Sequence, residues 1–358
     1  MWADYTRRIN TPSQIKSLPP NKFMTTNNIK EAAPLIWAEI EKAQNILLHC
    51  HFNPDQDSIG SALATMQTLE SMGKKVTVIK GDSDLPSFTK YLPGGEKIVL
   101  KNYFEINLAD FDLFISQDSA NLERISRVGE IVFPSHLKVV NIDHHSSNTN
   151  FGHINLVIPT KPATAQILSE LFTEWGVEIS SGVAGCLMVG LHADTGGFRH
   201  RGTTEETFIV AASLVKSCPD FDVILKNVYG SGTIGKLKFM GLMMSRVELL
   251  FGGKVAITYL GNEELRSLNV ENVEIKQTGL SGMMLELEGV QMSFLLVEYD
   301  PNYTGVSARS RDGVNYDVSK FLSEFGGGGH KVAAGAHIEK PAAEAKADLI
   351  AALTRLLQ

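Results

Sequence analysis

The chain has 358 residues, of which 43% are hydrophobic and 20% are charged, a composition that supports a sizeable core and excludes wholesale disorder. Its 33 lysine and arginine residues are outnumbered by 40 acidic residues, and the net charge of −7 excludes a basic protein that binds long duplex DNA. Three scattered cysteines form no disulfide or zinc motif and no apolar run reaches the length of a membrane span, so we expect a cytoplasmic, two-domain protein that contacts no membrane.

The first half of the chain has the pattern of a parallel sheet. Residues 1–28 are polar and include Pro12, Pro19 and Pro20, so we expect a flexible N-terminal arm. Short apolar or β-branched runs then alternate with segments of helical spacing. The runs predict strands at 45–50, 76–79, 111–115 and 137–142, and the helical segments lie at 29–43, 60–72, 163–175 and 204–216. This alternation predicts a first α/β domain over residues 29–222, in which a parallel sheet carries helices on both faces.

A second, smaller α/β domain is expected over residues 241–358. Glycine and lysine are frequent at 223–240, and we predict that this stretch connects the two domains. Beyond it, the pattern predicts strands at 255–260, 292–299 and 304–308 and helices at 318–325 and 341–357.

Acidic residues and histidines gather just past the apolar segments of the first domain. The four clusters are His49–Asp57, Ser116–Ser119, Asp143–His145 and His192–Gly197, which include Asp55, Asp118, His144 and Asp194. Because parallel strands end at one edge of their sheet, these side chains can converge there. Carboxylates brought together repel one another unless cations separate them, and a mixed carboxylate and imidazole set suits manganese. The number of ligands favours a two-metal site for phosphoryl hydrolysis, although Asp118 or Asp194 taken alone is better explained as a cap or turn residue.

A second candidate site lies near the C-terminus. Gly326–Gly329 precede His330 and Lys331, between two segments of helical pattern. We expect the glycines to let main-chain N–H groups bind an anion at a helix N-terminus, with a flexible linker as the alternative. Arg309 follows a predicted strand and is suited to hold a phosphate by two hydrogen bonds.

The order of these motifs resembles the DHH phosphoesterase family. His51, Asn53-Pro54-Asp55, Asp57, Asp118, Asp143-His144-His145 and Asp194 follow its metal-binding motifs. Arg309-Ser310 and Gly326–His330 resemble its C-terminal DHHA1 domain. The resemblance extends from residue 29 to the C-terminus and is strongest to the compact nano-RNase and pAp phosphatase branch, which is related to RecJ-type exonucleases.

The resemblance implies two Mn²⁺ ions per chain, with Mg²⁺ or Co²⁺ as substitutes. One ion would be held by His51, Asp55 and Asp118, and the other by Asp57, Asp118, His144 and Asp194, so that Asp118 is shared. His145 would contact the scissile phosphate, which makes His145 and Asp118 the candidate catalytic residues, and Asp143 would orient the histidines. The implied substrate-binding residues are His145, Arg309, Ser310, Gly328, Gly329 and His330.

The implied activity is hydrolysis of short oligonucleotides, of the dinucleotide pApA and of the 3′-phosphate of pAp, by a homodimer. An exopolyphosphatase or pyrophosphatase would use the same metals and is the first alternative. A nucleotide-binding regulator without turnover is the second. Release of mononucleotides in the presence of manganese distinguishes the nuclease from both.

Overall fold

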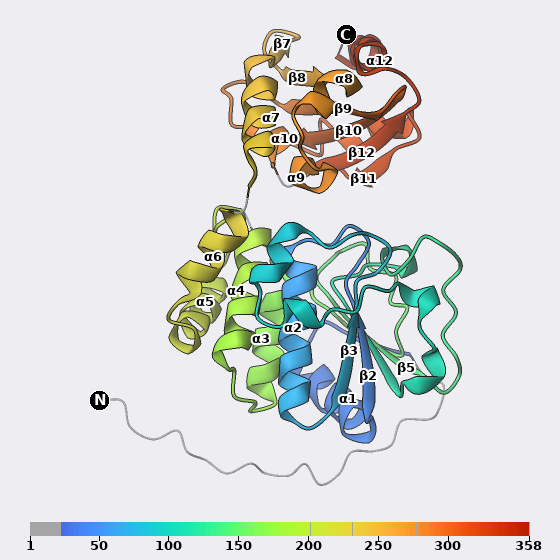
Figure 1. Ribbon diagram of the computed structural model, residues 1–358, viewed down its shortest axis with the longest axis vertical. Coiled ribbons are helices and arrows are strands. Elements are labelled where there is room, and N and C mark those ends of the chain that lie inside the picture. Colours follow the sequence, from blue (N-terminus) through green and yellow to red (C-terminus); the bar gives the residue numbers. More distant parts are fainter. Residues whose placement is uncertain (1–22, 201, 231, 277, 358) are drawn as a thin grey trace. The chain divides into compact units, whose positions relative to one another are not determined.

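The structure of the protein is a computed structural model that describes residues 23–200, 202–230, 232–276 and 278–357. The chain forms two compact units, Met1–Gly230 and Ser231–Gln358 (Figure 1). The predicted connector, 223–240, contains most of helix α6 (Phe221–Tyr229) and the first half of helix α7 (Ile234–Ser245). Within the described ranges, no helix is long and apolar enough to cross a membrane.

The first unit contains the predicted parallel sheet. Its six strands lie in the order β1-β6-β5-β4-β2-β3, and every neighbouring pair is parallel. The strands are β1 (Met24–Thr26), β2 (Asn45–His49), β3 (Lys75–Ile79), β4 (Leu113–Gln117), β5 (Lys138–Asp143) and β6 (Ile154–Val157). The helices of this unit besides α6 are α1 (Ile29–Lys42), α2 (Gln56–Ser71), α3 (Thr164–Glu174), α4 (Ser181–Asp194) and α5 (Glu205–Ser217).

The two faces of this sheet are covered differently. Ile46 and Leu48 of β2 pack into a core with α1 to α5, and α2, α3 and α4 lie side by side there (Figure 1). Leu47 and Phe114, which point to the opposite face, pack against the connections that join β3 to β4 and β4 to β5. These two connections contribute only short 3₁₀ turns, among them η3 (Tyr103–Glu105), η4 (Leu108–Asp110) and η5 (Leu122–Arg124). The α-helices therefore lie on one face, and 3₁₀ turns take the place of the helices expected on the other.

Three features of the first unit differ from the sequence prediction. Residues 1–22 of the expected arm lie outside the described residues, but Met24–Thr26 form β1, an edge strand that pairs with β6. Strand β6 itself was not predicted. Helix α4 was not predicted either, and Asp194 is its last residue rather than the end of a strand.

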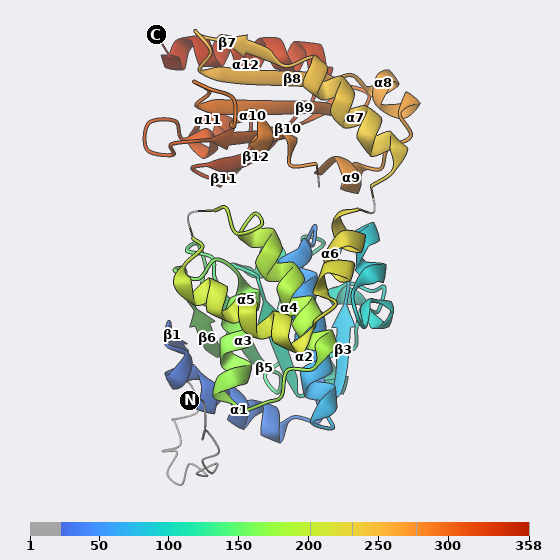
Figure 2. The same ribbon diagram turned by 90° about the vertical axis from the view of Figure 1, so that its left-hand side faces the viewer.

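The second unit is built on a mixed sheet in the order β11-β12-β10-β9-β8-β7. Only the pair β8–β9 is parallel. The strands are β7 (Glu248–Leu250), β8 (Val255–Leu260), β9 (Met292–Asp300), β10 (Tyr303–Ser310), β11 (Gly328–His330) and β12 (Ala333–Ile338). The helices besides α7 are α8 (Asn262–Ser267), α9 (Asn272–Lys276), α10 (Leu280–Met284), α11 (Val318–Ser323) and α12 (Ala342–Leu357). Helices α11 and α12 pack on one face of this sheet, and α7 to α10 cover the other (Figure 2).

The segment after the four glycines is not a helix. Gly328–His330 form β11, and Ala333–Ile338 form β12, its antiparallel neighbour. The prediction of a helix N-terminus at His330 was therefore wrong. The glycines let two strands approach closely, since a Cβ on Gly327 would lie 2.4 Å from the carbonyl oxygen of Gly335.

Candidate metal centre and substrate-binding residues

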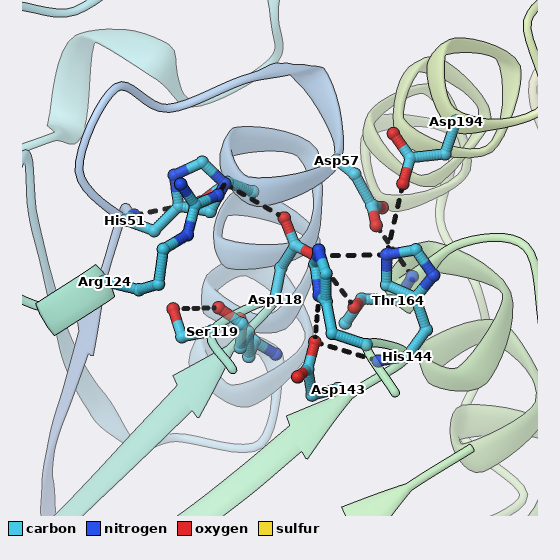
Figure 3. Close-up of polar contacts among 12 residues, drawn as sticks. His51, Asp57, Asp118, Ser119, Arg124, Asp143, His144, Thr164 and Asp194 are labelled. Carbon is cyan, nitrogen blue, oxygen red and sulfur yellow. Dashed lines mark hydrogen bonds and ion pairs between the residues drawn. The ribbon is translucent and has the colours of Figure 1, made fainter. Parts of the chain in front are cut away.

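The carboxyl ends of β2, β4 and β5 bring the predicted ligands of the first unit together (Figure 3). His51 follows β2, Asp118 follows β4 directly, and Asp143 ends β5. The remaining acidic ligands come from helices, because α2 begins beside Asp55 and α4 ends at Asp194. The sequence-predicted ligands thus form one site from strand ends and helix ends.

A first cluster, the His51 cluster, consists of His51, Asp55 and Asp118. Nε2 of His51 lies 3.2 Å from Oδ2 of Asp118 and 3.5 Å from Oδ2 of Asp55. The other ring nitrogen, Nδ1, lies 3.0 Å from the carbonyl oxygen of Phe52, to which it donates. This hydrogen bond directs Nε2 toward the two carboxylates.

A second cluster, the His144 cluster, consists of Asp57, His144 and Asp194. Nε2 of His144 lies 3.3 Å from Oδ2 of Asp194 and 3.5 Å from Oδ1 of Asp118. Nδ1 of the same ring lies 3.3 Å from the carbonyl oxygen of Lys161. Within the described residues the buried Nε2 forms no hydrogen bond of normal geometry, but Asp118 and Asp194 outweigh the effect of burial and raise the pKa of His144 well above its usual range.

Asp57 is held by the first turn of helix α3. The main-chain N–H groups of Thr164 and Ala165 donate to its two carboxylate oxygens at 2.7 and 2.9 Å. Asp57 has no exposed surface, and a Cβ on Gly190 of α4 would lie 2.6 Å from its Oδ1. Sequence analysis missed Thr164, for which the only signal was its place at the start of a predicted helix. The packing of α2, α3 and α4 therefore fixes this carboxylate.

Asp118 stands between the two clusters. Its Oδ2 faces His51, whereas its Oδ1 faces His144 and accepts a hydrogen bond from Oγ1 of Thr164 at 3.3 Å. The main chain of Asp118 has φ 51°, in the left-handed region that few side chains adopt. Such local strain is retained where the surrounding structure fixes it, commonly at functional sites.

The electrostatic environment of the site favours bound cations. Burial and the charges of neighbouring carboxylates raise the pKa of Asp57 well above its usual range and raise that of Asp194 to about 6. Burial alone would lower the pKa of His51, but Asp55 and Asp118 outweigh it and raise the pKa to about 9. The site therefore takes up protons wherever no other cation is present, and divalent cations relieve the same repulsion.

The donor set fits divalent metal ions. Carboxylates and imidazoles together suit first-row transition metals, and each cluster offers at least three donor atoms that lie within 4.8 Å of one another. Nδ1 of each ring lies beside a main-chain carbonyl oxygen, so Nε2 of both His51 and His144 faces the carboxylates. Either histidine can therefore serve as a ligand through Nε2 without losing a hydrogen bond to the main chain.

Asp143 connects the histidine pair to the sheet. Its Oδ1 accepts from the main-chain N–H of His144 at 2.9 Å and lies 2.7 Å from Nδ1 of His145. Its Oδ2 accepts from Nδ2 of Asn148 at 2.6 Å, a contact that the sequence analysis did not identify. Burial would lower the pKa of His145, but the hydrogen bond to Asp143 raises it. Asp143 therefore orients His145 and favours its protonated form.

Arg124 is a further residue of this site that sequence analysis missed. It ends η5, and its Nη2 lies 2.7 Å from Nε2 of His51 (Figure 3). A single arginine in a loop gives no pattern, and no signal in the sequence points to this contact.

The second unit contains the predicted phosphate-binding residues. Arg309 on β10 and His330 on β11 are both in register with Ala333 of β12, so their side chains extend from the same face of the sheet. Arg309 is partly buried, and burial lowers its pKa. It donates to the carbonyl oxygen of Ala308 at 2.9 Å, and among the described residues no carboxylate pairs with it. A partly buried arginine without an acidic partner is suited to bind an anion.

The other predicted residues of this unit lie differently. Ser310 follows Arg309 on the strand, so its side chain points to the opposite face, where Oγ accepts from the N–H of Asp312. Gly328 and Gly329 are exposed in β11, and Gly329 has φ 144°. Arg309, His330 and the glycines of β11 therefore lie around one part of the sheet, whereas the Ser310 side chain does not join them.

Comparisons with known proteins identify relatives of both units. The sequence model of the DHH family, N-terminal domain, matches residues 45–191, and that of the DHHA1 domain matches residues 252–358. The bifunctional oligoribonuclease and PAP phosphatase NrnA of Thermus thermophilus is 32% identical over 307 residues, which cover 84% of this chain and 87% of that protein. The crystal structure of an exopolyphosphatase-related protein from Bacteroides fragilis is similar with a TM-score of 0.83 and 26% identity, over 92% of this chain and 96% of that one.

A more distant structure shares the fold alone. RecJ from Thermus thermophilus, solved in complex with Mn²⁺, has a TM-score of 0.50 and 16% identity, over 92% of this chain and 54% of RecJ. From the two matched domains and the similarity to NrnA, we conclude that the chain belongs to the DHH–DHHA1 phosphoesterase family.

Proposed function

We propose that the protein is a manganese-dependent phosphodiesterase that hydrolyses short oligonucleotides, including pApA, and also removes the 3′-phosphate of pAp. The observation that carries this proposal is the position of Asp118, whose two carboxylate oxygens face His51 and His144 at 3.2 and 3.5 Å. A carboxylate placed in this way could serve as a ligand of two divalent ions. The similarity to an oligoribonuclease and PAP phosphatase supports the class of substrate.

In this proposal the two clusters hold one ion each and share Asp118. The ligands are His51, Asp55 and Asp118 for one ion, and Asp57, Asp118, His144 and Asp194 for the other. When bound, two divalent ions neutralise phosphoryl oxygens and lower the pKa of a nearby water molecule. The protein fixes the ligands beforehand, because the N–H groups of α3 hold Asp57 and main-chain carbonyls orient both imidazoles.

We assign to His145 a direct contact with the scissile phosphate. Its ring lies beside that of His144, with the two centroids 4.4 Å apart, and its Nδ1 also lies 3.7 Å from Oδ1 of Asp118. Because Asp143 favours the protonated ring, His145 can donate a hydrogen bond to a phosphoryl oxygen and stabilise the charge that develops there.

The second unit would bind the terminal phosphate or nucleotide of the substrate. The support is the lack of a carboxylate partner for Arg309 and its shared face with His330. Recognition of a substrate end, rather than of a continuous strand, accounts for a preference for short oligonucleotides. The net charge of −7 agrees with this preference, since a long single strand would require an extended basic groove.

A time course on a substrate panel tests the proposal. The metal-free full-length protein is loaded with Mn²⁺, Mg²⁺ or Co²⁺ and incubated with pApA, a short RNA, pAp, pyrophosphate and polyphosphate, and the products are separated by chromatography. We expect AMP from pApA and from the RNA, with the highest rate in Mn²⁺, and no AMP from the Asp118→Ala variant. The proposal fails if Mn²⁺-loaded protein leaves pApA, the RNA and pAp intact.

An exopolyphosphatase is the second candidate function. The observation in its favour is the similarity to the exopolyphosphatase-related protein from Bacteroides fragilis, which extends over 92% of this chain. Phosphate release from polyphosphate alone in the panel would establish this candidate in place of the nuclease. The cytoplasmic location and the homodimer remain predictions, and size-exclusion chromatography with light scattering tests the latter.

A further inference from the structure

Arg124 is attached to the loop that carries His51 by both its main chain and its side chain. The N–H of Phe52 donates to the carbonyl oxygen of Arg124 at 2.7 Å. In return, Nη1 of Arg124 lies 3.4 Å from the carbonyl oxygen of Phe52, and Nη2 lies 2.7 Å from Nε2 of His51. The guanidinium is therefore fixed at the nitrogen that we assign to the metal.

The hydrogen bonds around His51 define the roles of its two ring nitrogens. A metal ion binds the neutral form of the ring, in which Nδ1 donates to the carbonyl oxygen of Phe52 and Nε2 carries the lone pair. In that form Nε2 accepts from Arg124, because a guanidinium has donors only. Asp118 and Asp55 approach the same nitrogen to 3.2 and 3.5 Å with further acceptor oxygens. Three acceptor atoms thus lie close together, namely Nε2 of His51 and one carboxylate oxygen each of Asp55 and Asp118. Arg124 places a positive charge beside them.

We propose that Arg124 is the resident counter-cation of the His51 cluster and competes with a divalent metal ion for Nε2 of His51. This inference rests on the proposed two-metal function. The imidazole has one lone pair at Nε2, so it cannot accept from Arg124 and bind a metal ion at the same time. Metal binding at the His51 cluster must therefore break the contact with Arg124, which lowers the metal affinity of that cluster.

The His144 cluster has no equivalent competitor. Among the described residues, Nε2 of His144 faces the carboxylates of Asp118 and Asp194 and contacts no lysine or arginine side chain, and Asp57 accepts from main-chain N–H groups and from the hydroxyl of Ser61. No lysine or arginine of the described residues forms an ion pair with Asp57 or Asp194. The His144 cluster is thus the tighter metal subsite, and the His51 cluster is the one that loads second.

Binding of Mn²⁺ to the metal-free full-length protein tests the competition without measuring activity. Free Mn²⁺ is followed by electron paramagnetic resonance during titration, which gives a dissociation constant for each subsite. Arg124→Gln removes the charge, and Arg124→Met removes the charge and the hydrogen-bonding capacity. Thermal denaturation of each metal-free variant shows that it is folded.

Arg127→Gln is the matched control. Arg127 also lies beside this loop, with its guanidinium 4.3 Å from the centroid of the Phe52 ring, but it has no contact with His51. The Arg127→Gln variant also loses one positive charge, three residues from Arg124 in the sequence. It therefore separates the effect of the contact with His51 from the general effect of losing a positive charge.

We expect either Arg124 variant to lower the dissociation constant of the weaker subsite by about tenfold, as expected for removal of a charge-assisted hydrogen bond. The tighter subsite and the Arg127→Gln protein should bind Mn²⁺ as the wild type does. An unchanged or higher dissociation constant in a folded Arg124 variant, or an equal decrease in Arg127→Gln, overturns the proposal. If the wild type binds two Mn²⁺ ions and the substitutions change nothing, only the competition is refuted. If the wild type and both Arg124 variants bind no Mn²⁺, the two-metal function fails as well.

Discussion

Substitution of Gly190 by alanine tests how closely helix α4 controls the metal ligands. A Cβ at this position would lie 2.6 Å from Oδ1 of Asp57, 3.0 Å from Cβ of Ala165 and 3.1 Å from Cα of Asp57. None of these atoms is the end of a flexible exposed side chain, because Asp57 and Ala165 are fully buried. Relief of the clash therefore requires movement of α4 or of the carboxylate itself, which is held by two N–H groups of α3.

Two opposing effects determine how far Gly190→Ala changes the stability of the protein. An alanine in place of a glycine inside a helix stabilises by about 0.5–1 kcal/mol, whereas overpacking of a buried site costs about 1–3 kcal/mol. We expect Gly190→Ala to destabilise the protein by about 1 kcal/mol and to weaken Mn²⁺ binding, because Asp57 can no longer keep its position. The midpoint of urea unfolding and the Mn²⁺ titration measure the two effects separately.

Gly241→Ala provides the matched control for this prediction. Gly241 also lies inside a helix, α7, and its added Cβ would meet no atom within 4 Å. This variant gains the helix propensity without the clash, so we expect it to be at least as stable as the wild type, with unchanged Mn²⁺ binding. The reasoning is refuted if Gly190→Ala is as stable as Gly241→Ala and binds Mn²⁺ with the affinity of the wild type.

Three further predictions concern the ligands and the substrate. Asp118→Asn keeps a residue that tolerates φ 51°, and it should lose one bound Mn²⁺ and more than about 10²-fold in activity on pApA. Its control is Asp312→Asn, at a half-buried aspartate of the second unit outside the candidate metal centre. Burial raises the pKa of Asp57 and of Asp194, the latter to about 6, and both carboxyl groups must release their protons to bind a metal ion. The affinity for Mn²⁺ should therefore rise as the pH increases through about 6, and an affinity that stays constant between about pH 5 and about pH 8 contradicts this prediction. Arg309→Gln should raise KM for pApA without changing the affinity for Mn²⁺. Its control is Arg266→Gln, at an exposed position, which should change neither KM nor the Mn²⁺ affinity. Equal KM values for the two variants would exclude Arg309 from substrate binding.

The sequence identified those parts of the fold that have a regular pattern. Strand β8 was predicted at its observed bounds, and β2, β3, β4 and β5 within a few residues, because each is a short apolar or β-branched run. Strands β2, β4, β5 and β8 are almost wholly buried, whereas the edge strand β3 is buried only at its C-terminal end. Helix α4 was missed for a related reason. Residues Val183 to Leu191 are all buried, so the helix shows no alternation of polar and apolar faces.

Short strands without a core pattern could not be predicted. Strand β1 has three residues, and its place at the sheet edge depends on pairing with β6, which is distant in the chain. The glycines before His330 likewise allow a helix N-terminus, a linker or a strand, and only the pairing of β11 with β12 selects the strand. Local sequence carries no information on such partners, because the hydrogen bonds that stabilise them join segments far apart.

The sequence by itself determined which residue types are available for metal binding and near which strand ends they lie. Their order and spacing in His51, Asp118, His144 and Asp194 sufficed to indicate the family. Only the tertiary structure decided how these groups face one another, with Asp118 between two imidazoles, Asp57 on the N–H groups of α3 and Arg124 on His51. These contacts depend on strand order and helix packing, because they join groups that are far apart in the sequence and close only in the packed fold.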